Sequence, residues 1–235
     1  MSNNVIKNND EIIAKKSKNL LERIPTKKNR KQVENALEFS IKMHHGQTRK
    51  SGLPFVSHCI DVANILIDWN MDHTTVVSAL LHDVVEDTEV KLSDIEEEFG
   101  SDVALLVDGV TKVENIAFRS KKHKQAENFT KLFLSLARDL RVIIIKFADR
   151  LNNMETIQYL SSKKRKEIAL ETKEIFVPLA HRLGMAQLKW KLEDLSLKCL
   201  DLRAFNGIKK KIETSSRLNE DILSNAIKPI KSELN

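Results

Sequence analysis

Apolar residues recur every three or four positions along most of this chain, which is the spacing of one buried face of an α-helix. A clear example is SHCIDVANILIDWN at residues 57–70. The pattern predicts helices over residues 11–24, 34–45, 57–70, 74–88, 92–99, 101–112, 126–160 (broken in two near Asp139), 163–184 and 186–201. Gly46, Gly52 and Pro54 mark a donor-rich loop after the second of these segments. We therefore expect an all-α fold of successive helices joined by short turns.

Composition agrees with this pattern. The 235 residues include only 6 Gly and 4 Pro, and aromatic residues make up 5%, a balance that favours helices over strands. A chain of this length can bury one substantial core. We expect a polar arm or first helix over residues 1–30, one main domain over residues 31–200 and a helical linker over residues 201–235, with a polar connection at residues 114–125.

The net charge of +6 raises the question of a nucleic-acid partner. The basic excess lies near the two ends of the chain, because residues 1–50 hold 12 Lys and Arg against 5 Asp and Glu, and residues 203–235 hold 7 against 4. The basic runs KKHK at residues 121–124 and KKRK at residues 163–166 lack neighbouring aromatic residues on which bases could stack. We therefore expect no nucleic-acid partner.

No segment has the features of a membrane span or a secretory signal. The strongest apolar run, VIII at residues 142–145, ends at Lys146, whereas a membrane helix needs roughly 20 apolar residues. The two cysteines, Cys59 and Cys199, form no CxxC pair, and we expect both to be packing thiols in a reducing compartment. These features predict a cytoplasmic protein.

The stretch ALLHDVVEDTE, residues 79–89, places one histidine and four acids directly after an apolar run. In a continuous helix, Asp83 and Asp87 would be i,i+4 neighbours and would repel each other unless a cation lay near them. His58, His82, Asp83 and Asp149 together supply two imidazoles and two carboxylates, a set that suits Mn²⁺ ahead of Zn²⁺ or Mg²⁺. Taken singly, each residue also has an ordinary structural explanation, such as a helix cap or an ion pair, so only the set is informative.

Five ordered motifs give the chain a wider resemblance: RKSGLPFVSH, ALLHDVVEDT, FGSDVALLVDGVTK, IIIKFADRLNNM and PLAHRLG. Together they resemble the HD phosphohydrolase superfamily and, within it, the hydrolase half of the RelA/SpoT family, over roughly residues 35–200. The resemblance implies a multi-helix HD-domain bundle over residues 31–200 with a metal site in its core cleft. It also implies that one Mn²⁺ per chain is held by the metal ligands His58, His82, Asp83 and Asp149.

The same resemblance implies an activity. The family removes the 3′-pyrophosphate of the alarmones ppGpp and pppGpp with water, leaving GDP or GTP, in control of the stringent response. By resemblance, Glu86 and Asp87 are the catalytic pair that orients or deprotonates the water. The implied nucleotide contacts are Arg49 against the guanine base, Lys50 and Ser51 along the nucleotide site, and Asn153 and Thr156 in the pocket.

The chain departs from the family pattern in two ways. After ADRL it reads NNMET, with Asn152 where histidine is usual and Glu155 where arginine is usual, so the anion at Glu155 is expected to weaken phosphate contacts. The chain also stops in what resembles the linker before a synthetase domain, so we expect no alarmone synthesis. We expect an active hydrolase. Two alternatives are an HD phosphohydrolase acting on another nucleotide and a non-catalytic alarmone-binding sensor.

Overall fold

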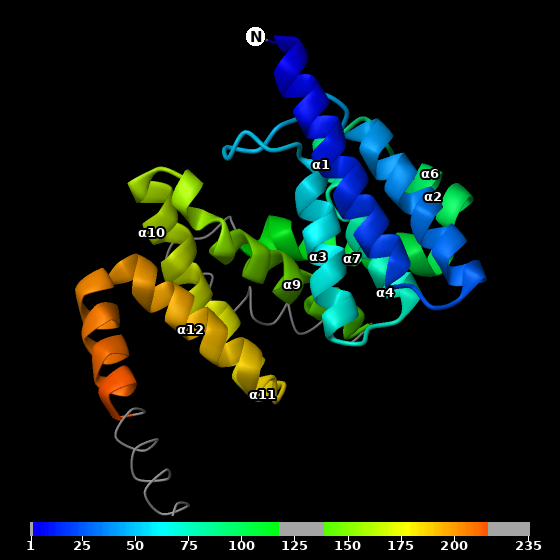
Figure 1. Cartoon of the computed structure of the whole chain (residues 1–235). Helices are drawn as coiled ribbons and strands as arrows, with labels where there is room; N and C mark the ends of the chain where they lie inside the picture. The colour runs from blue at the N-terminus through cyan, green and yellow to red at the C-terminus, as the bar shows by residue number, and fades with distance from the viewer. Residues whose placement is uncertain (1, 118–138, 216–235) are drawn as a thin grey trace, which may run out of the picture. The chain divides into compact units, whose positions relative to one another are not determined.

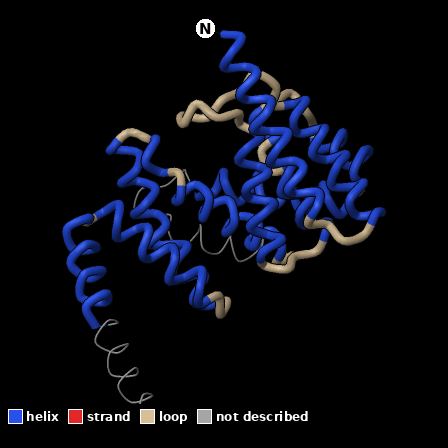
Figure 2. The backbone as a smooth tube through the Cα atoms, viewed as in Figure 1, coloured by secondary structure: helices blue, strands red, loops and turns tan. Residues whose placement is uncertain are grey.

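The computed structural model describes residues 2–117 and 139–215, and within those ranges the regular structure is helical apart from one isolated bridge between Thr48 and Pro54 (Figures 1 and 2). The predicted all-α fold is confirmed. In chain order the elements are α1 (Ser2–Glu22), α2 (Lys27–Met43), α3 (Val56–Asp68), α4 (His73–Leu81), α5 (Val84–Asp87), α6 (Leu92–Phe99), α7 (Ser101–Ala117), α9 (Arg141–Glu155), the 3₁₀ turn η1 (Ile157–Tyr159), α10 (Ser162–Glu171), the π-turn η2 (Thr172–Phe176), α11 (Val177–Arg182) and α12 (Ala186–Leu200).

The chain forms two compact units that meet in sequence between Tyr159 and Leu160. In the second unit, α12 packs against α10, η2 and α11, and residues 202–215 are also helical. The domain boundaries expected at residues 30 and 200 stay predictions.

Helix α3 lies at the centre of the first unit and packs against α1, α4 and α9. Its buried face includes Ile60, Ala63 and Leu66, and α4 supplies an almost wholly buried run over residues 75–82. Helix α9 contributes Ile145 and Phe147, neither of which is exposed to solvent. This apolar packing fixes three helices side by side, and these helices carry the polar residues discussed below.

The N-terminal segment is a docked helix rather than a free polar arm. Helix α1 runs alongside α3 (Figure 1), and Lys16 Nζ pairs with Asp61 Oδ2 of α3 at 2.6 Å. Arg23 makes a second ion pair with Asp68 near the other end of α3. Leu20 and Ile24 are buried, so α1 covers part of the apolar core.

The single helix expected over residues 74–88 is wrong. Helix α4 ends at Leu81, a turn follows at His82 and Asp83, and α5 begins at Val84. The imidazole Nδ1–H of His82 donates to the Ala79 carbonyl at 2.7 Å, and that carbonyl would accept the Asp83 N–H in a continuous helix. The side chain of His82 thus competes with the backbone and turns the chain at the His-Asp pair.

Two other helix boundaries differ from expectation. Helix α7 continues to Ala117, so the connection expected at residues 114–125 begins as helix, and the rest of that stretch lies outside the described residues. The segment expected as one helix over residues 163–184 is interrupted by η2. The expected break near Asp139 agrees with α9, which begins at Arg141, whereas the first of the two helices expected there falls outside the described ranges.

The loop between α2 and α3 projects beyond the helices (Figure 2). Its two sides are joined by backbone bonds from Arg49 N to Leu53 O at 2.9 Å and from Phe55 N to Gln47 O at 3.0 Å. Gly52 turns the chain at the tip with a φ of 83°, a left-handed conformation that favours glycine. The loop therefore presents Arg49, Lys50 and Ser51 on a defined hairpin-like turn.

Helices α7 and α9 approach closely at Gly109. A Cβ atom at this position would lie 2.6 Å from Val142 Cγ2 and 3.2 Å from Val142 Cγ1. Valine has one strongly preferred rotamer in a helix, so its side chain cannot turn away at little cost. The missing side chain at Gly109 therefore sets the spacing of these helices.

We expect Gly109→Ala to lower the free energy of unfolding by up to about 2 kcal/mol, because overpacking costs about 1–3 kcal/mol and better helix propensity offsets about 1 kcal/mol of that cost. The matched control is Gly207→Ala, since Gly207 is also helical but has no atom within 4 Å of an added Cβ. That control should be neutral or slightly stabilising in denaturant unfolding. Equal stability of the two variants would contradict the close approach.

Candidate metal centre

Three packed helices bring four sequence-predicted ligand residues to one place. His58 lies in the first turn of α3, His82 and Asp83 form the turn between α4 and α5, and Asp149 lies in the middle of α9. His58 Nε2 is 3.2 Å from Asp149 Oδ1 and 3.7 Å from Asp83 Oδ2. His82 Nε2 is 3.0 Å from Asp83 Oδ1 and 4.0 Å from Asp149 Oδ1. Residues separated by up to 91 positions in sequence therefore form one compact cluster.

Both imidazoles are held with one nitrogen facing this cluster. His58 Nδ1–H donates to Asn152 Oδ1 at 2.7 Å, and His82 Nδ1–H donates to Ala79 O at 2.7 Å. In each ring the proton at Nδ1 leaves the Nε2 lone pair directed at the carboxylates. This is the arrangement in which a second hydrogen bond fixes the tautomer of a metal-binding histidine.

The cluster is unfavourable without a cation. His82 Nε2 is buried and has no hydrogen-bond partner, although Asp83 Oδ1 lies 3.0 Å away, because two acceptor atoms face each other. Such lone pairs repel unless a proton or a metal ion lies between them. The ligand atoms of His58, His82 and Asp149 all lie within 4.8 Å of one another, a spacing that fits ligands sharing one ion. The residues present therefore fit a divalent metal.

Lys146 balances part of the negative charge from within the same helix. Its Nζ is 2.8 Å from Asp149 Oδ2, and both side chains are buried. Burial alone would raise the pKa of Asp149, but the Lys146 ammonium beside it acts in the opposite direction, and that pKa lies well below its usual range. Asp149 is therefore ionised, with Oδ2 on Lys146 and Oδ1 left toward the histidines.

The nucleotide residues expected from sequence fall into two groups. Arg49 Nη2 donates to Asn153 Oδ1 at 2.8 Å, and Asn153 Nδ2 donates to Asp149 Oδ1 at 2.6 Å, so a continuous hydrogen-bond path joins the loop to the cluster. The Arg49 guanidinium also lies over the Phe55 ring, 5.6 Å from its centroid. Lys50, Ser51 and Thr156 form the other group, which lies outside this path. Lys50 is exposed, and the Ser51 hydroxyl accepts from Leu53 N–H. The Thr156 hydroxyl donates to Asn152 O at the end of α9.

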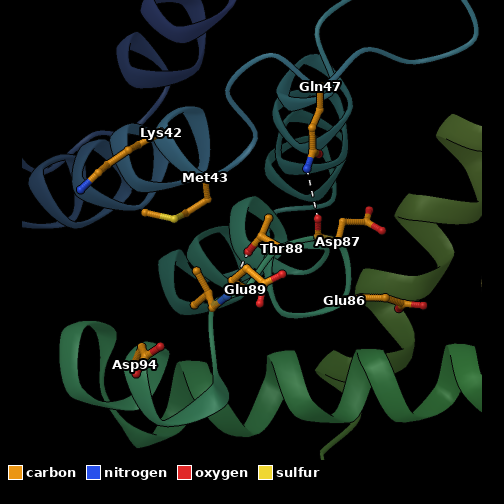
Figure 3. Close-up of a pocket in the computed structure, with 9 residues that line it drawn as sticks. Lys42, Met43, Gln47, Glu86, Asp87, Thr88, Glu89 and Asp94 are labelled. Carbon is orange, nitrogen blue, oxygen red and sulfur yellow. Dashed lines mark hydrogen bonds between the residues drawn. The ribbon is translucent and has the colours of Figure 1, made fainter.

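Glu86 and Asp87 lie on α5, directly after the His-Asp turn, and both are exposed. They line an open pocket of about 800 Å³ together with Gln47 and Glu89. Figure 3 shows the Glu86 and Asp87 carboxylates pointing to the same side of the view, away from Lys42 and Met43 on α2. The pair is thus placed at a solvent-accessible opening beside the ligand-bearing turn.

Gln47 links this acidic pair to the loop. Its Nε2 donates to the Asp87 carbonyl at 3.1 Å, a bond drawn in Figure 3, and its Oε1 accepts from His44 Nδ1–H at 2.8 Å. His44 stacks on Phe55 with ring centroids 4.7 Å apart, and burial lowers the pKa of His44, which favours the neutral ring. Gln47 therefore ties α5 to the same loop that carries Arg49.

Several of these contributors were missed in the sequence. Lys146 lies three residues before Asp149, and that i,i+3 spacing on a helix was a usable signal for the ion pair. Asn152 was noted only as a departure from the family pattern, yet its amide oxygen fixes His58. Gln47 and His44 carried no local signal, because their partners lie in other parts of the fold. Cys59 is buried beside His58, where burial raises the pKa of its thiol well above the ordinary value.

We expect Asn152→Leu to weaken divalent-metal binding by about 10–100-fold, the usual cost of losing the outer partner of a ligating histidine. Leucine fills a similar volume but cannot accept the His58 Nδ1–H. Asn152→Asp keeps an acceptor oxygen and should retain most of the affinity. Titration of metal-stripped protein with Mn²⁺ measures both variants, and unchanged affinity in Asn152→Leu would refute the positioning role.

Comparison with known proteins identifies the fold family. A family model described as HD domain matches residues 36–186, well over half of the chain. A solved structure described as "A metazoan ortholog of SpoT hydrolyzes ppGpp and plays a role in starvation responses" is similar, with a TM-score of 0.54 and 27% identity, over 73% of this chain and 94% of that one. Within the part of the chain that the structure describes, no helix is both long and apolar enough to cross a membrane.

Curated relatives agree with the structural match. The chain is 43% identical over 191 residues to a guanosine-3′,5′-bis(diphosphate) 3′-pyrophosphohydrolase of Haemophilus influenzae, covering 81% of this chain and 28% of the relative. It is 48% identical over 170 residues to a probable enzyme of the same name from Synechocystis sp., covering 72% of this chain and 22% of that relative. The chain thus spans about a quarter of the length of these relatives. An HD domain binds a divalent metal, and the chain belongs to the HD-domain family, in its RelA/SpoT branch.

Proposed function

We propose that this chain is a metal-dependent (p)ppGpp 3′-pyrophosphohydrolase, which removes the 3′-pyrophosphate of ppGpp or pppGpp with water and leaves GDP or GTP. The observation that carries the proposal is the contact between buried His82 Nε2 and half-buried Asp83 Oδ1, two facing acceptors that need a cation. The acidic residues Glu86 and Asp87, which line the open pocket, follow this pair on the next turn of the chain. The substrate class comes from the names of the curated relatives and from the ppGpp hydrolysis ascribed to the similar metazoan protein. We expect the site of action to be the cytoplasm.

We propose Mn²⁺ as the resident ion, one per chain, held by His58, His82, Asp83 and Asp149. Two imidazoles with two carboxylates form a borderline to hard donor set, which suits Mn²⁺ better than it suits metals that prefer several thiolates. When bound, a divalent ion in this position supplies Lewis-acid chemistry, because it neutralises phosphoryl charge and makes water more acidic.

The roles of the other residues follow from their positions. Glu86 and Asp87 are exposed carboxylates at the opening, where a base can accept a proton from water as it attacks phosphorus. Gln47 holds the Asp87 backbone and thus the orientation of this short helix. Lys146 keeps Asp149 ionised and places its Oδ1 toward the histidines.

Arg49 is the proposed contact to guanine. Its guanidinium is already half-buried over Phe55 and oriented by Asn153, so a planar base can stack on it with little loss of side-chain entropy. Because Asn153 also bonds to Asp149, base binding at the loop is mechanically linked to the metal centre. Lys50, Ser51 and Thr156 are proposed as further nucleotide contacts.

The direct experiment incubates metal-stripped protein with ppGpp, with and without Mn²⁺, and separates GDP and pyrophosphate from substrate. Mn²⁺-dependent formation of both products in equal amounts supports the proposal. Tight binding of ppGpp without products would favour a sensor instead. Turnover of another nucleotide in preference to ppGpp would place the chain among the other HD phosphohydrolases.

We expect Glu86→Gln and Asp87→Asn to lower the hydrolysis rate by about 10²–10⁴-fold while Mn²⁺ binding persists, because each removes a proton acceptor but no metal ligand. Glu89→Gln is the matched control, since Glu89 lines the same pocket and is also exposed but lies beyond the end of α5. Its rate should stay near that of the unaltered protein. Equal rates in all three variants would remove the pair from the mechanism.

A further inference from the structure

Cys59 lies unexpectedly close to the metal centre. It follows His58 on α3 and is completely buried. Its Sγ, a ring nitrogen of His82 and a carboxylate oxygen of Asp83 all lie within 4.8 Å of one another. The sequence alone predicted a packing thiol, whereas the fold places this thiol among groups that can bind an ion.

This second group of donors shares His82 with the group formed by His58, His82 and Asp149. Asp83, a member of the second group, also lies 3.7 Å from His58 Nε2 of the first. Nδ1 of His82 is bonded to Ala79 O, and Nε2 is buried without a hydrogen-bond partner. His82 Nε2 is therefore the nitrogen left to bind an ion.

The two sets differ in chemical softness. The histidine–carboxylate set suits ions such as Mn²⁺, whereas a set of thiolate, imidazole and carboxylate contains the donor types that Zn²⁺ takes in proteins. Thiophilic ions gain strongly from a sulfur ligand, and hard ions gain little. The choice of ion should therefore decide which residues ligate it.

We propose that Cys59 is an alternative metal ligand, which with His82 and Asp83 draws thiophilic divalent ions such as Zn²⁺, Cd²⁺ and Co²⁺ into a sulfur-containing coordination, the thiol proton being released to solvent as the metal–sulfur bond forms. Such an ion occupies His82 and Asp83, so it competes with Mn²⁺ for the same centre and inhibits the Mn²⁺-supported reaction. Binding of the ion by Cys59 does not depend on which reaction the chain catalyses. Inhibition of the Mn²⁺-supported reaction, in contrast, rests on the function proposed above.

The test uses Co²⁺, whose bond to a thiolate gives a charge-transfer absorption in the near ultraviolet that nitrogen and oxygen ligands do not give. The chain contains only two cysteines, so in Cys199→Ala the thiol of Cys59 is the sole possible sulfur ligand of this type. Cys199 lies in the second unit, where its thiol donates to Arg165 O at 3.6 Å, which makes this variant a matched control. One equivalent of Co²⁺ is added to each metal-stripped protein.

We expect the charge-transfer band in the unaltered protein and in Cys199→Ala, and its loss in Cys59→Ala and Cys59→Ser. If Co²⁺ binds to Cys199→Ala without giving the charge-transfer band, the proposal is overturned. This outcome does not depend on whether the Cys59 variants fold. Circular dichroism and retained Mn²⁺ binding show that the Cys59 variants keep the fold.

Inhibition is measured separately, as Zn²⁺ or Cd²⁺ added to the Mn²⁺-supported reaction. We expect the inhibition constant to rise at least about tenfold in Cys59→Ser, because even loss of an outer-shell partner costs about 10–100-fold in metal affinity. Equal inhibition of the unaltered protein and Cys59→Ser would contradict the competition. If Mn²⁺ supports no hydrolysis at all, the proposed function fails, while the Co²⁺ spectrum still decides whether Cys59 is a ligand.

Discussion

The nitrogen of buried His82 and the carboxylate of half-buried Asp83 face each other across 3.0 Å, and the rest of the site is arranged around that unfavourable contact. Acceptors held this close repel each other unless a cation joins them. The repulsion is maintained because each ring is fixed from behind, His82 by Ala79 O and His58 by Asn152. Packing of α3, α4 and α9 holds the backbone positions of these side chains, so the cluster fits a divalent cation.

The same helix that supplies Asp149 also connects the centre to its surroundings. Lys146 takes one oxygen of Asp149, Asn153 donates to the other, and Asn153 in turn holds Arg49 at the loop. A separate path runs from the loop through Gln47 to the Asp87 backbone. The loop is thus joined to the metal-ligand residue Asp149 through Asn153 and to the acidic helix α5 through Gln47. A substrate that reorganises this loop would affect both together.

Much of this arrangement could be predicted from the sequence. The helical periodicity predicted an all-α fold, and the His58, His82–Asp83 and Asp149 set predicted residues that the structure brings together. The break at His82 could not be predicted from periodicity, because it depends on one imidazole competing for a backbone carbonyl. The contacts of Gln47 and the proximity of Cys59 to Asp83 also arise from packing between distant segments. Local pattern predicts elements, whereas tertiary packing determines which side chains meet.

The proposed chemistry depends most directly on one divalent ion being held by His82 and its neighbours. Electron paramagnetic resonance of free Mn²⁺, recorded as metal-stripped protein is titrated, counts the bound ions and measures their affinity. We predict saturation at one ion per chain in the unaltered protein and loss of that site in a folded His82→Ala variant. Equal stoichiometry and affinity in both proteins would contradict a centre built on His82, because the ion would then lie elsewhere.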